Sequence, residues 1–271
     1  MPNSDKHGLI GVGTAPRSLL SRLPSLRRKL GPIKGVSYST GRKLALTLRS
    51  GFAVPNYGAL AACPVIWVMV PDESLEQVLR GLAEQPPLPK SILVICGSSR
   101  ESRDFPFLKG QRVATLNLID DTSTSGFVAE GHRDALHVIR ALLKQEQRRL
   151  LEIRAGSKSA YLASVQLMTL LIRALVTSAI QCLQVTGIAR PDAVDLVSAL
   201  ATRSAKSQGR VGAKSWSSAE RQELRHALEL RVHELRELCP LESEVYASAV
   251  VLALEYFERL GAPRKVRSHH A

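Results

Sequence analysis

Closely spaced glycines near the start of the chain constrain its fold more than any other feature. An apolar stretch from Gly8 runs into Gly11-Val-Gly13, and a leucine-periodic segment typical of a helix follows from about Arg17. Glycines let a strand turn sharply into a helix and let the backbone approach a pyrophosphate, which the N–H groups of the helix N-terminus then face. The stretch therefore predicts a turn that binds a dinucleotide. The residues expected at the diphosphate are Gly11, Val12, Gly13, Thr14, Ala15 and Pro16.

Pro16 stands where the dinucleotide fingerprint has its third glycine. Proline suits the first turn of a helix, because its fixed φ is helical and the N–H that it lacks would have no partner inside the helix. Two glycines alone are a weak signal, so an ordinary strand-to-helix turn is the alternative interpretation. A Pro16 ring that fills the turn would favour that alternative.

Positive charge is concentrated in the same part of the chain. The formal net charge is +13, and residues 1–50 account for +9 of it, with ten Lys or Arg against one acidic residue. Such a field attracts a multiply charged anion. The alternatives are a solvated basic surface and non-specific binding to nucleic acid. With five Phe and five Tyr in 271 residues and no interleaving of aromatic and basic residues, the sequence does not favour specific nucleic-acid binding.

The chain divides into two parts by the kind of periodicity. Apolar runs of strand length alternate with helical patterns at first, which is the rhythm of a parallel sheet covered by helices on both faces. We expect strands at 9–12, 32–37, 52–54, 65–70, 92–96, 113–118, 127–129 and 150–153, and helices at about 17–30, 41–49, 74–82 and 133–147. Later only helices are expected, at 159–186, 191–202, 218–238 and 241–260, with a loop at 204–216 and a frayed basic tail at 264–271. The sequence thus predicts an α/β fold: a Rossmann-like, mostly parallel sheet over 1–154 and an all-α domain over 155–271.

The expected helix around residues 161–188 is apolar on most sides. Polar side chains and the mid-helix Arg173 argue against a membrane span, since a charge at that depth is costly. We expect this helix in a large core or in a dimer interface. The cysteines Cys63, Cys96, Cys182 and Cys239 have no CxxC spacing and no secretory signal is apparent, so reduced thiols and a cytoplasmic location are expected.

The segment after the second expected strand indicates which dinucleotide is bound. Enzymes that bind NAD have a carboxylate there for the ribose 2′-hydroxyl, and no acidic residue occurs between Lys34 and Arg49. Hydroxyls and cations suit a 2′-phosphate, so NADP is the expected cofactor. The residues expected near the 2′-phosphate are Ser37, Ser39, Thr40 and Arg42. The alternative is that Arg42 and Lys43 only form the exposed face of a helix.

Four motifs carry a resemblance to a known family: Gly11-Val-Gly13, Val70-Pro71-Asp72-Glu73, Cys96-Gly97-Ser98 and Lys158-Ser-Ala-Tyr161. In order and spacing they resemble a bacterial family of NADP-binding oxidoreductases, related to pyrroline-5-carboxylate reductase and to 6-phosphogluconate dehydrogenase-like proteins. The resemblance covers nearly the whole chain. It implies that NADP also passes Val70, Pro71, Asp72, Gly97 and Ser98. It further implies that the 6-phosphogluconate dehydrogenase-like helical domain closes a substrate pocket and forms a homodimer.

The sequence departs from this family at two positions. Asn117 and Leu162 stand where relatives tend to have histidine, and neither can donate a proton at neutral pH. The remaining catalytic candidates are Lys158, Tyr161 and Ser98. The alternatives are a surface lysine at a helix start, a packing tyrosine and a serine that caps its turn.

The leading hypothesis is an NADP-dependent oxidoreductase that moves a hydride to or from a small imine or carbonyl substrate in a pocket between the domains. The alternative is a catalytically silent protein of the same fold that binds nucleotide or serves as a scaffold. No HExxH or similar pair of ligands occurs, so no catalytic metal is expected.

Overall fold

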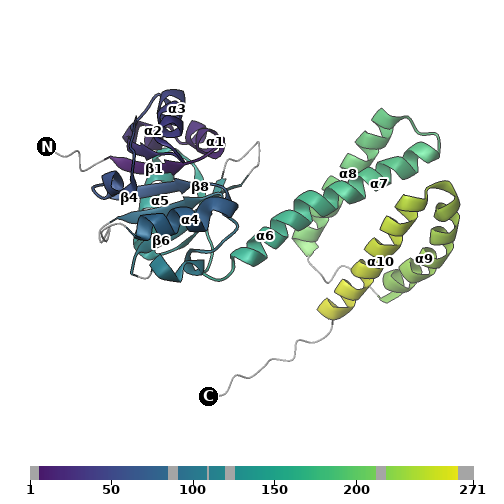
Figure 1. The fold of residues 1–271 in the computed structure, drawn as a ribbon. Coiled ribbons are helices and arrows are strands. Elements are labelled where there is room, and N and C mark those ends of the chain that lie inside the picture. The colour runs from purple at the N-terminus through teal and green to yellow at the C-terminus, as the bar shows by residue number, and fades with distance from the viewer. Residues whose placement is uncertain (1–5, 85–90, 109, 120–125, 212–217, 262–271) are drawn as a thin grey trace, which may run out of the picture. The chain divides into compact units, whose positions relative to one another are not determined.

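The computed structural model describes residues 6–84, 91–108, 110–119, 126–211 and 218–261. The chain divides into two compact units, residues 1–163 and residues 164–271. The first unit contains a sheet with helices on its faces, and the second consists of helices (Figure 1). The boundary between the units falls within α6 (Lys158–Gln166), the first helix after the last strand.

The first unit is built on an eight-stranded sheet in the order β3-β2-β1-β4-β5-β6-β7-β8. The strands are β1 (His7–Gly11), β2 (Leu30–Lys34), β3 (Phe52–Ala53), β4 (Val65–Met69), β5 (Ile92–Cys96), β6 (Arg112–Ile119), β7 (Gly126–Gly131) and β8 (Arg149–Glu152). Every neighbouring pair is parallel except β6 and β7, which are antiparallel. The predicted α/β fold with a mostly parallel sheet is confirmed. Because the strand order reverses between β1 and β4, ligands are expected at the carboxyl ends of these strands.

Helices cover both faces of this sheet. They are α1 (Ala15–Arg22), α2 (Pro24–Lys29), α3 (Tyr38–Leu48), α4 (Asp72–Ala83) and α5 (Arg133–Gln145). On one face Trp67 and Val94 pack in a core with leucines of α1, α2 and α5, and on the other Ile66 and Val68 pack against Leu75 of α4. All five residues of β4 are buried, as expected for a continuous apolar strand at the centre of a parallel sheet.

The structure has two helices where the sequence pattern predicted one over 17–30. The chain leaves helical geometry at Leu23, with ψ of 66°, and Pro24 begins α2. Proline disfavours the helical conformation of the residue before it and has no N–H to continue the first helix. The break at Leu23 is therefore a local effect of Pro24.

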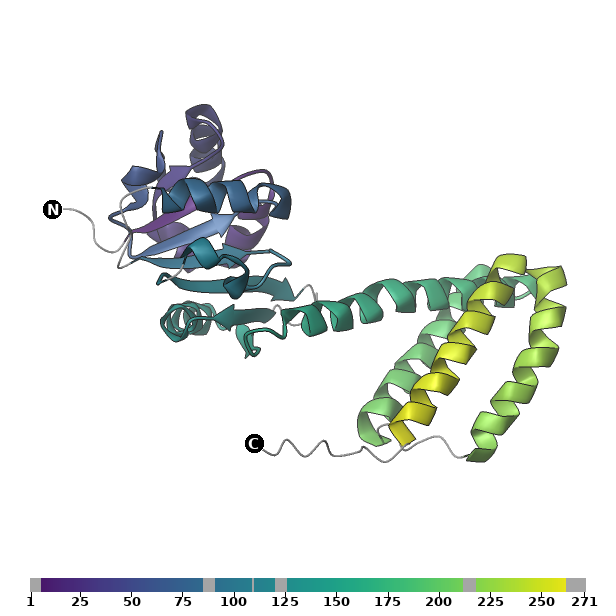
Figure 2. The same ribbon diagram turned by 60° about the horizontal axis from the view of Figure 1, so that its bottom comes forward.

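The remaining helices continue from the first unit into the second. They are α6, the π-helical segment η4 (Leu167–Leu171), α7 (Ile172–Val185), α8 (Arg190–Val211), α9 (Ser218–Leu238) and α10 (Pro240–Gly261). Within the second unit α9 and α10 lie side by side as a hairpin, at the yellow end of the colour scale in Figure 2. The loop predicted at 204–216 is wrong for residues 204–211, which belong to α8. Alanine, lysine, glutamine and arginine in that stretch favour helix and outweigh its serines and single glycine. Residues 212–216 of that predicted loop, and the predicted tail at 264–271, lie outside the described residues.

The continuous helix Lys158–Val185 has little cover from its own chain. Among the described residues it is the one helix long and apolar enough to cross a membrane by length and composition, with a mean hydropathy of 1.6 over its most apolar window. No residue of that window is buried, and α7 has no buried residue. The expectation that the chain's own core encloses this helix is wrong, and the expected dimer interface remains a prediction.

Candidate functional site

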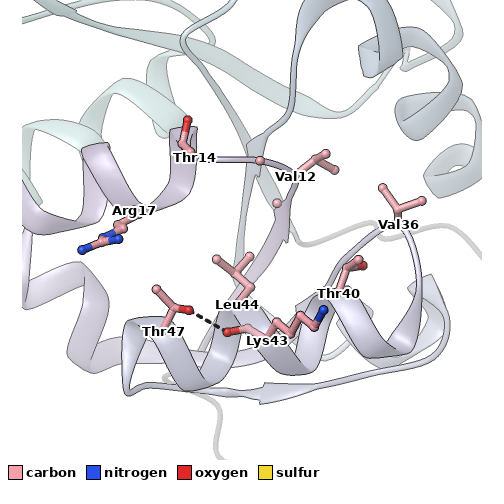
Figure 3. A pocket seen from close by; sticks show the side chains of 10 residues that line it. Val12, Thr14, Arg17, Val36, Thr40, Lys43, Leu44 and Thr47 are labelled. Carbon is pink, nitrogen blue, oxygen red and sulfur yellow. Dashed lines mark hydrogen bonds between the residues drawn. The ribbon is translucent and has the colours of Figure 1, made fainter.

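A cavity of about 310 Å³ lies at the carboxyl ends of β1 and β2. Its walls come from the turn after β1, the first residues of α1 and one face of α3 (Figure 3). It is lined by Gly11, Val12, Gly13, Thr14, Arg17, Val36, Thr40, Lys43, Leu44 and Thr47. The structure thus brings together residues that the sequence assigned to the diphosphate and Thr40, which it assigned to the 2′-phosphate.

The two glycines of the turn have different structural roles. A Cβ atom on Gly11 would lie 2.8 Å from Cγ of Pro16 and 2.9 Å from Cδ2 of Leu44, so glycine lets β1, α1 and α3 approach closely. Gly13 has a φ of +70°, which glycine adopts without strain, and its Cβ position has open space within 4 Å. Gly11 is needed for packing and Gly13 for the turn beside the cavity.

Pro16 does not close the turn. It is buried in the first turn of α1, against Gly11, and is not part of the cavity wall. Thr14 at the N-cap makes no side-chain capping hydrogen bond, and the first turn of α1 has no acidic residue. The N-terminal N–H groups of α1 therefore have no side-chain cap, an arrangement that favours an anion.

The opposite wall begins at the N-terminus of α3, which starts earlier than predicted because Ser37 and Thr40 cap it. Ser37 N–H donates to Thr40 Oγ1 at 2.8 Å, and Thr40 N–H donates to Ser37 Oγ at 3.2 Å. A Cβ on Gly35 would lie 2.5 Å from the nitrogen of Gly41, so α3 packs directly onto the end of β2. Both hydroxyls already hold the helix start in place, where the sequence interpretation had assigned them to a phosphate.

Sequence reasoning did not assign five of the cavity residues to the cofactor: Arg17, Val36, Lys43, Leu44 and Thr47. Figure 3 shows Thr40, Lys43, Leu44 and Thr47 along one stretch of α3. These four residues have i, i+3, i+4 and i+7 spacing, which places them on one face of a helix. Arg42, Ser37 and Ser39 are not among the lining residues. Counted from Thr40, which the sequence had already assigned to the phosphate, the helical period could have identified Lys43 as the cation on this face.

The other predicted cofactor residues lie at the same edge of the sheet but outside this cavity. Val70 and Pro71 follow β4, and Gly97 follows β5 with a φ of +76° and open space at its Cβ position. Asp72 links the two loops, because its Oδ2 accepts hydrogen bonds from the N–H and hydroxyl of Ser99. Burial raises the pKa of Asp72, but hydrogen bonds from Ser98 and Ser99 and the charge of Lys158 outweigh it, so the pKa is lowered overall.

Ser98 is fully buried at the turn after β5. Its hydroxyl oxygen accepts the N–H of Arg100 at 3.0 Å, and its carbonyl oxygen accepts the side-chain amide of Asn117 at 3.0 Å. The alternative interpretation, a serine that caps its own turn, describes these contacts. Asn117, one of the two positions where a histidine was expected from the resemblance, likewise holds the loop.

Lys158 is buried at the start of α6, so the surface-lysine interpretation is wrong. Its Nζ donates to the carbonyl oxygen of Arg100 at 2.8 Å. Burial lowers the pKa of Lys158, although nearby carboxylates and the Cys96 thiol partly oppose this. Tyr161, one turn along α6, is half-buried, and burial raises the pKa of its phenol. Of the three catalytic candidates, Tyr161 alone has a partly exposed side chain.

In the described part of the chain, no group of three or more His, Cys, Asp or Glu side chains could hold a metal ion. The four cysteines are free, and burial raises the pKa of Cys63 and of Cys182 to about 11 in each case. Thiols with raised pKa values are poor nucleophiles at neutral pH.

The same fold occurs in solved structures of low sequence identity. A reductive aminase from Aspergillus terreus, in complex with NADPH and ethyl levulinate, superimposes with a TM-score of 0.62 at 14% identity, over 94% of this chain and 93% of that one. The V8 variant of an imine reductase from Myxococcus stipitatus, in complex with NAD+, has a TM-score of 0.66 at 16% identity, over 93% and 94% of the two chains. The protein TM1727 from Thermotoga maritima has a TM-score of 0.61 at 20% identity, over 94% and 99%. These likenesses establish a Rossmann-like fold followed by helices.

No protein-family model matches the sequence. No curated protein matches it either.

Proposed function

We propose that the chain is an NADP-dependent oxidoreductase that transfers a hydride to or from a small imine or carbonyl compound. The observation that carries this proposal is the open cavity, where a positive-φ glycine, an uncapped helix N-terminus and two cations meet. Structures of the same fold support it, since they include proteins in complex with NADPH or NAD+. The bound cofactor would supply the hydride, and the protein would supply orientation and charge.

The residues around the cavity fit the parts of this cofactor. The backbone N–H groups of Gly13, Thr14 and Ala15 would hold the diphosphate, because the helix N-terminus has no side chain that competes for them. Lys43 and Arg17 would attract the 2′-phosphate, and no carboxylate lines the cavity. We assign the 2′-phosphate to Lys43 beside Thr40, in preference to Arg42.

We propose Tyr161 as the proton donor. Its phenol has a raised pKa, so it stays protonated at neutral pH and can act as an acid but not as a base. Ser98 and Lys158 are buried and bonded to the main chain, and we assign them to holding the loop after β5.

Turnover tests this assignment. Oxidation of NADPH should be measured by its absorbance against a panel of cyclic imines and keto acids, for the wild type and for Tyr161→Phe. We expect kcat of the variant to fall by about a hundredfold or more, the usual range for a lost general acid, with cofactor affinity unchanged. A variant as active as the wild type would refute the role of Tyr161.

A catalytically silent nucleotide-binding or scaffolding protein is the second candidate. The contacts of Ser98, Asn117 and Lys158 favour it, because each of these side chains holds main chain. Tight NADPH binding without turnover across the whole panel would establish this candidate in place of the enzyme.

We also propose that a second copy of the chain covers the apolar helix. Leu167, Met168 and Leu170 are exposed there, and beside them an apolar groove of about 390 Å³ runs between α7 and α10. Contiguous apolar surface of this kind marks an interaction site in a soluble protein. The free cysteines suit a reducing compartment, and we place the protein in the cytoplasm.

A further inference from the structure

Charged side chains are buried in the first unit, at the point where α6 begins. Glu130 is 0% exposed, Lys158 2% and Glu101 6%. They come from β7, from the start of α6 and from the segment after β5, which are far apart in the sequence. A buried charge is costly unless it is paired and hydrogen-bonded, so such a group requires a structural explanation.

Glu130 holds the segment after β5 from the side of the sheet. Its Oε1 accepts the N–H of Ser102 at 2.8 Å and the hydroxyl of Thr115, on β6, at 2.7 Å. Its Oε2 accepts the hydroxyl of Ser102 at 2.7 Å. Two of these three donors belong to Ser102 and the third to β6, so the carboxylate fixes the position of Ser102 against the sheet.

Glu101 and Lys158 hold the same segment from the side of α6. The Lys158 N–H donates to Oε1 of Glu101 at 3.0 Å, and its ammonium donates to the carbonyl oxygen of Arg100 at 2.8 Å. Arg103 forms an ion pair with Glu101 at 2.8 Å. The segment from Ser98 to Arg103 is thus fastened to the sheet on one side and to α6 on the other.

Lys158 places a positive charge near three carboxylates, of which Glu101 also pairs with Arg103. Its ammonium interacts favourably with Glu130, Asp72 and Glu101. Asp72, at the start of α4 after β4, accepts a hydrogen bond from Ser99 in the loop after β5. The ammonium of Lys158 is therefore linked to the segments that follow both strands. Removal of the ammonium would leave buried carboxylates with less compensation, and that arrangement is strongly unfavourable.

We propose that Lys158 is a positioning residue for the cofactor, which sets the loop after β5 for the nicotinamide half and transfers no proton itself. This inference rests on the proposed function. A dinucleotide lies across the crevice where the strand order reverses, so its second half passes the ends of β4 and β5 once the first half occupies the cavity at β1 and β2. Gly97 directly follows β5 and has open space at its Cβ position, so the start of this loop leaves room for a ligand.

The test compares a whole cofactor with half of one. NADPH and adenosine 2′,5′-bisphosphate should be titrated by calorimetry into the wild type, Lys158→Met and the double variant Lys158→Met/Glu130→Gln. We expect Lys158→Met to bind NADPH about tenfold or more weakly than the wild type, which is a usual size for an energetic coupling between two parts of a protein. It should bind the bisphosphate as tightly as the wild type does. The double variant should regain most of the NADPH affinity, because it removes one carboxylate together with the cation.

Other outcomes would decide between this inference and its alternatives. If Lys158→Met bound NADPH normally but lost turnover, Lys158 would be a proton donor. If it bound both ligands equally weakly, its role would be general stability. If Lys158→Met did not fold, a double variant that folded and bound NADPH would support the inference, because it removes a buried carboxylate together with the cation. A double variant that also did not fold would refute it. A wild type that bound neither ligand would refute the proposed function itself.

Discussion

Gly11 and Gly13 are two residues apart, yet a side chain would be unfavourable at each for a different physical reason. At Gly11 the obstacle is steric, since two carbon atoms lie within 3 Å of the Cβ position. At Gly13 there is space, but the backbone is in the left-handed region.

Alanine substitutions can separate these two effects. Gly11→Ala should lower the free energy of unfolding by about 1–3 kcal/mol, the usual cost of overpacking. Gly13→Ala should cost about 1–2 kcal/mol through its backbone alone, and should leave the contacts among β1, α1 and α3 unchanged. Urea unfolding measures both. Overcrowding at Gly11 would be disproved if Gly11→Ala were as stable as the wild type.

Asp72 should make stability depend on pH in the acid range. Its pKa is lowered in the folded protein, so its contribution is present above the pKa of the unfolded chain, about 3.9, and is lost as the pH falls through the folded value. Asp72→Asn should therefore be less stable than the wild type at neutral pH, and the difference should shrink below about pH 4. Thermal unfolding across pH measures this, with Glu73→Gln, an exposed neighbour on α4, as the control. A difference that stayed constant down to pH 2 would contradict it.

Among the elements, α3 links local sequence to the site most directly. Ser37 caps it, Gly35 and Gly41 let it pack on β2, and one of its faces lines the cavity. A change at the cap should therefore act on both stability and binding.

We expect Ser37→Ala to destabilise the protein by about 1 kcal/mol, because the capping box loses one of its two reciprocal bonds. NADPH affinity should fall as well, since the cap fixes the start of the helix that carries Lys43. Ser39→Ala, two residues further on and outside the capping box, is the matched control. Equal effects of the two substitutions would show that the cap has no special role.

The central strands could be predicted from the sequence more closely than the ends of some helices. β4 and β5 were predicted to within a residue because continuous apolar runs of strand length have few alternatives in a parallel sheet. The break at Pro24 was missed because a single residue interrupts a longer helical pattern. The extension of α8 through residue 211 was missed because the serines and glycine of that stretch were given more weight than its helix-favouring residues.

The site could be predicted only where it is local in sequence. The glycine turn was found from its motif, whereas the choice of Lys43 over Arg42 depends on the phase of α3. The burial of Lys158 could not be predicted, because its partners Glu101 and Glu130 approach it only after the sheet has formed.

For the whole molecule, the proposal to test is that a second copy covers the exposed apolar surface of the second unit. If the chain is a homodimer, light scattering should give a particle of twice the 29.6 kDa chain mass. Leu170→Glu should convert it to a monomer, because a charge in an apolar interface is costly to bury. Leu46→Glu, at an equally exposed leucine of α3, should leave the mass unchanged. A wild type that is monomeric at all concentrations would exclude the dimer.

The sharpest test of NADP binding in the cavity at β1 and β2 is a comparison of two reduced cofactors. NADPH and NADH should be titrated into the wild type and into Lys43→Ala, followed by the fluorescence of the reduced nicotinamide. We expect the wild type to bind NADPH at least about tenfold more tightly than NADH, and Lys43→Ala to lose most of this preference, because a charge-assisted contact to the 2′-phosphate is removed. Equal affinities of the wild type for the two cofactors, or no binding of either, would contradict it.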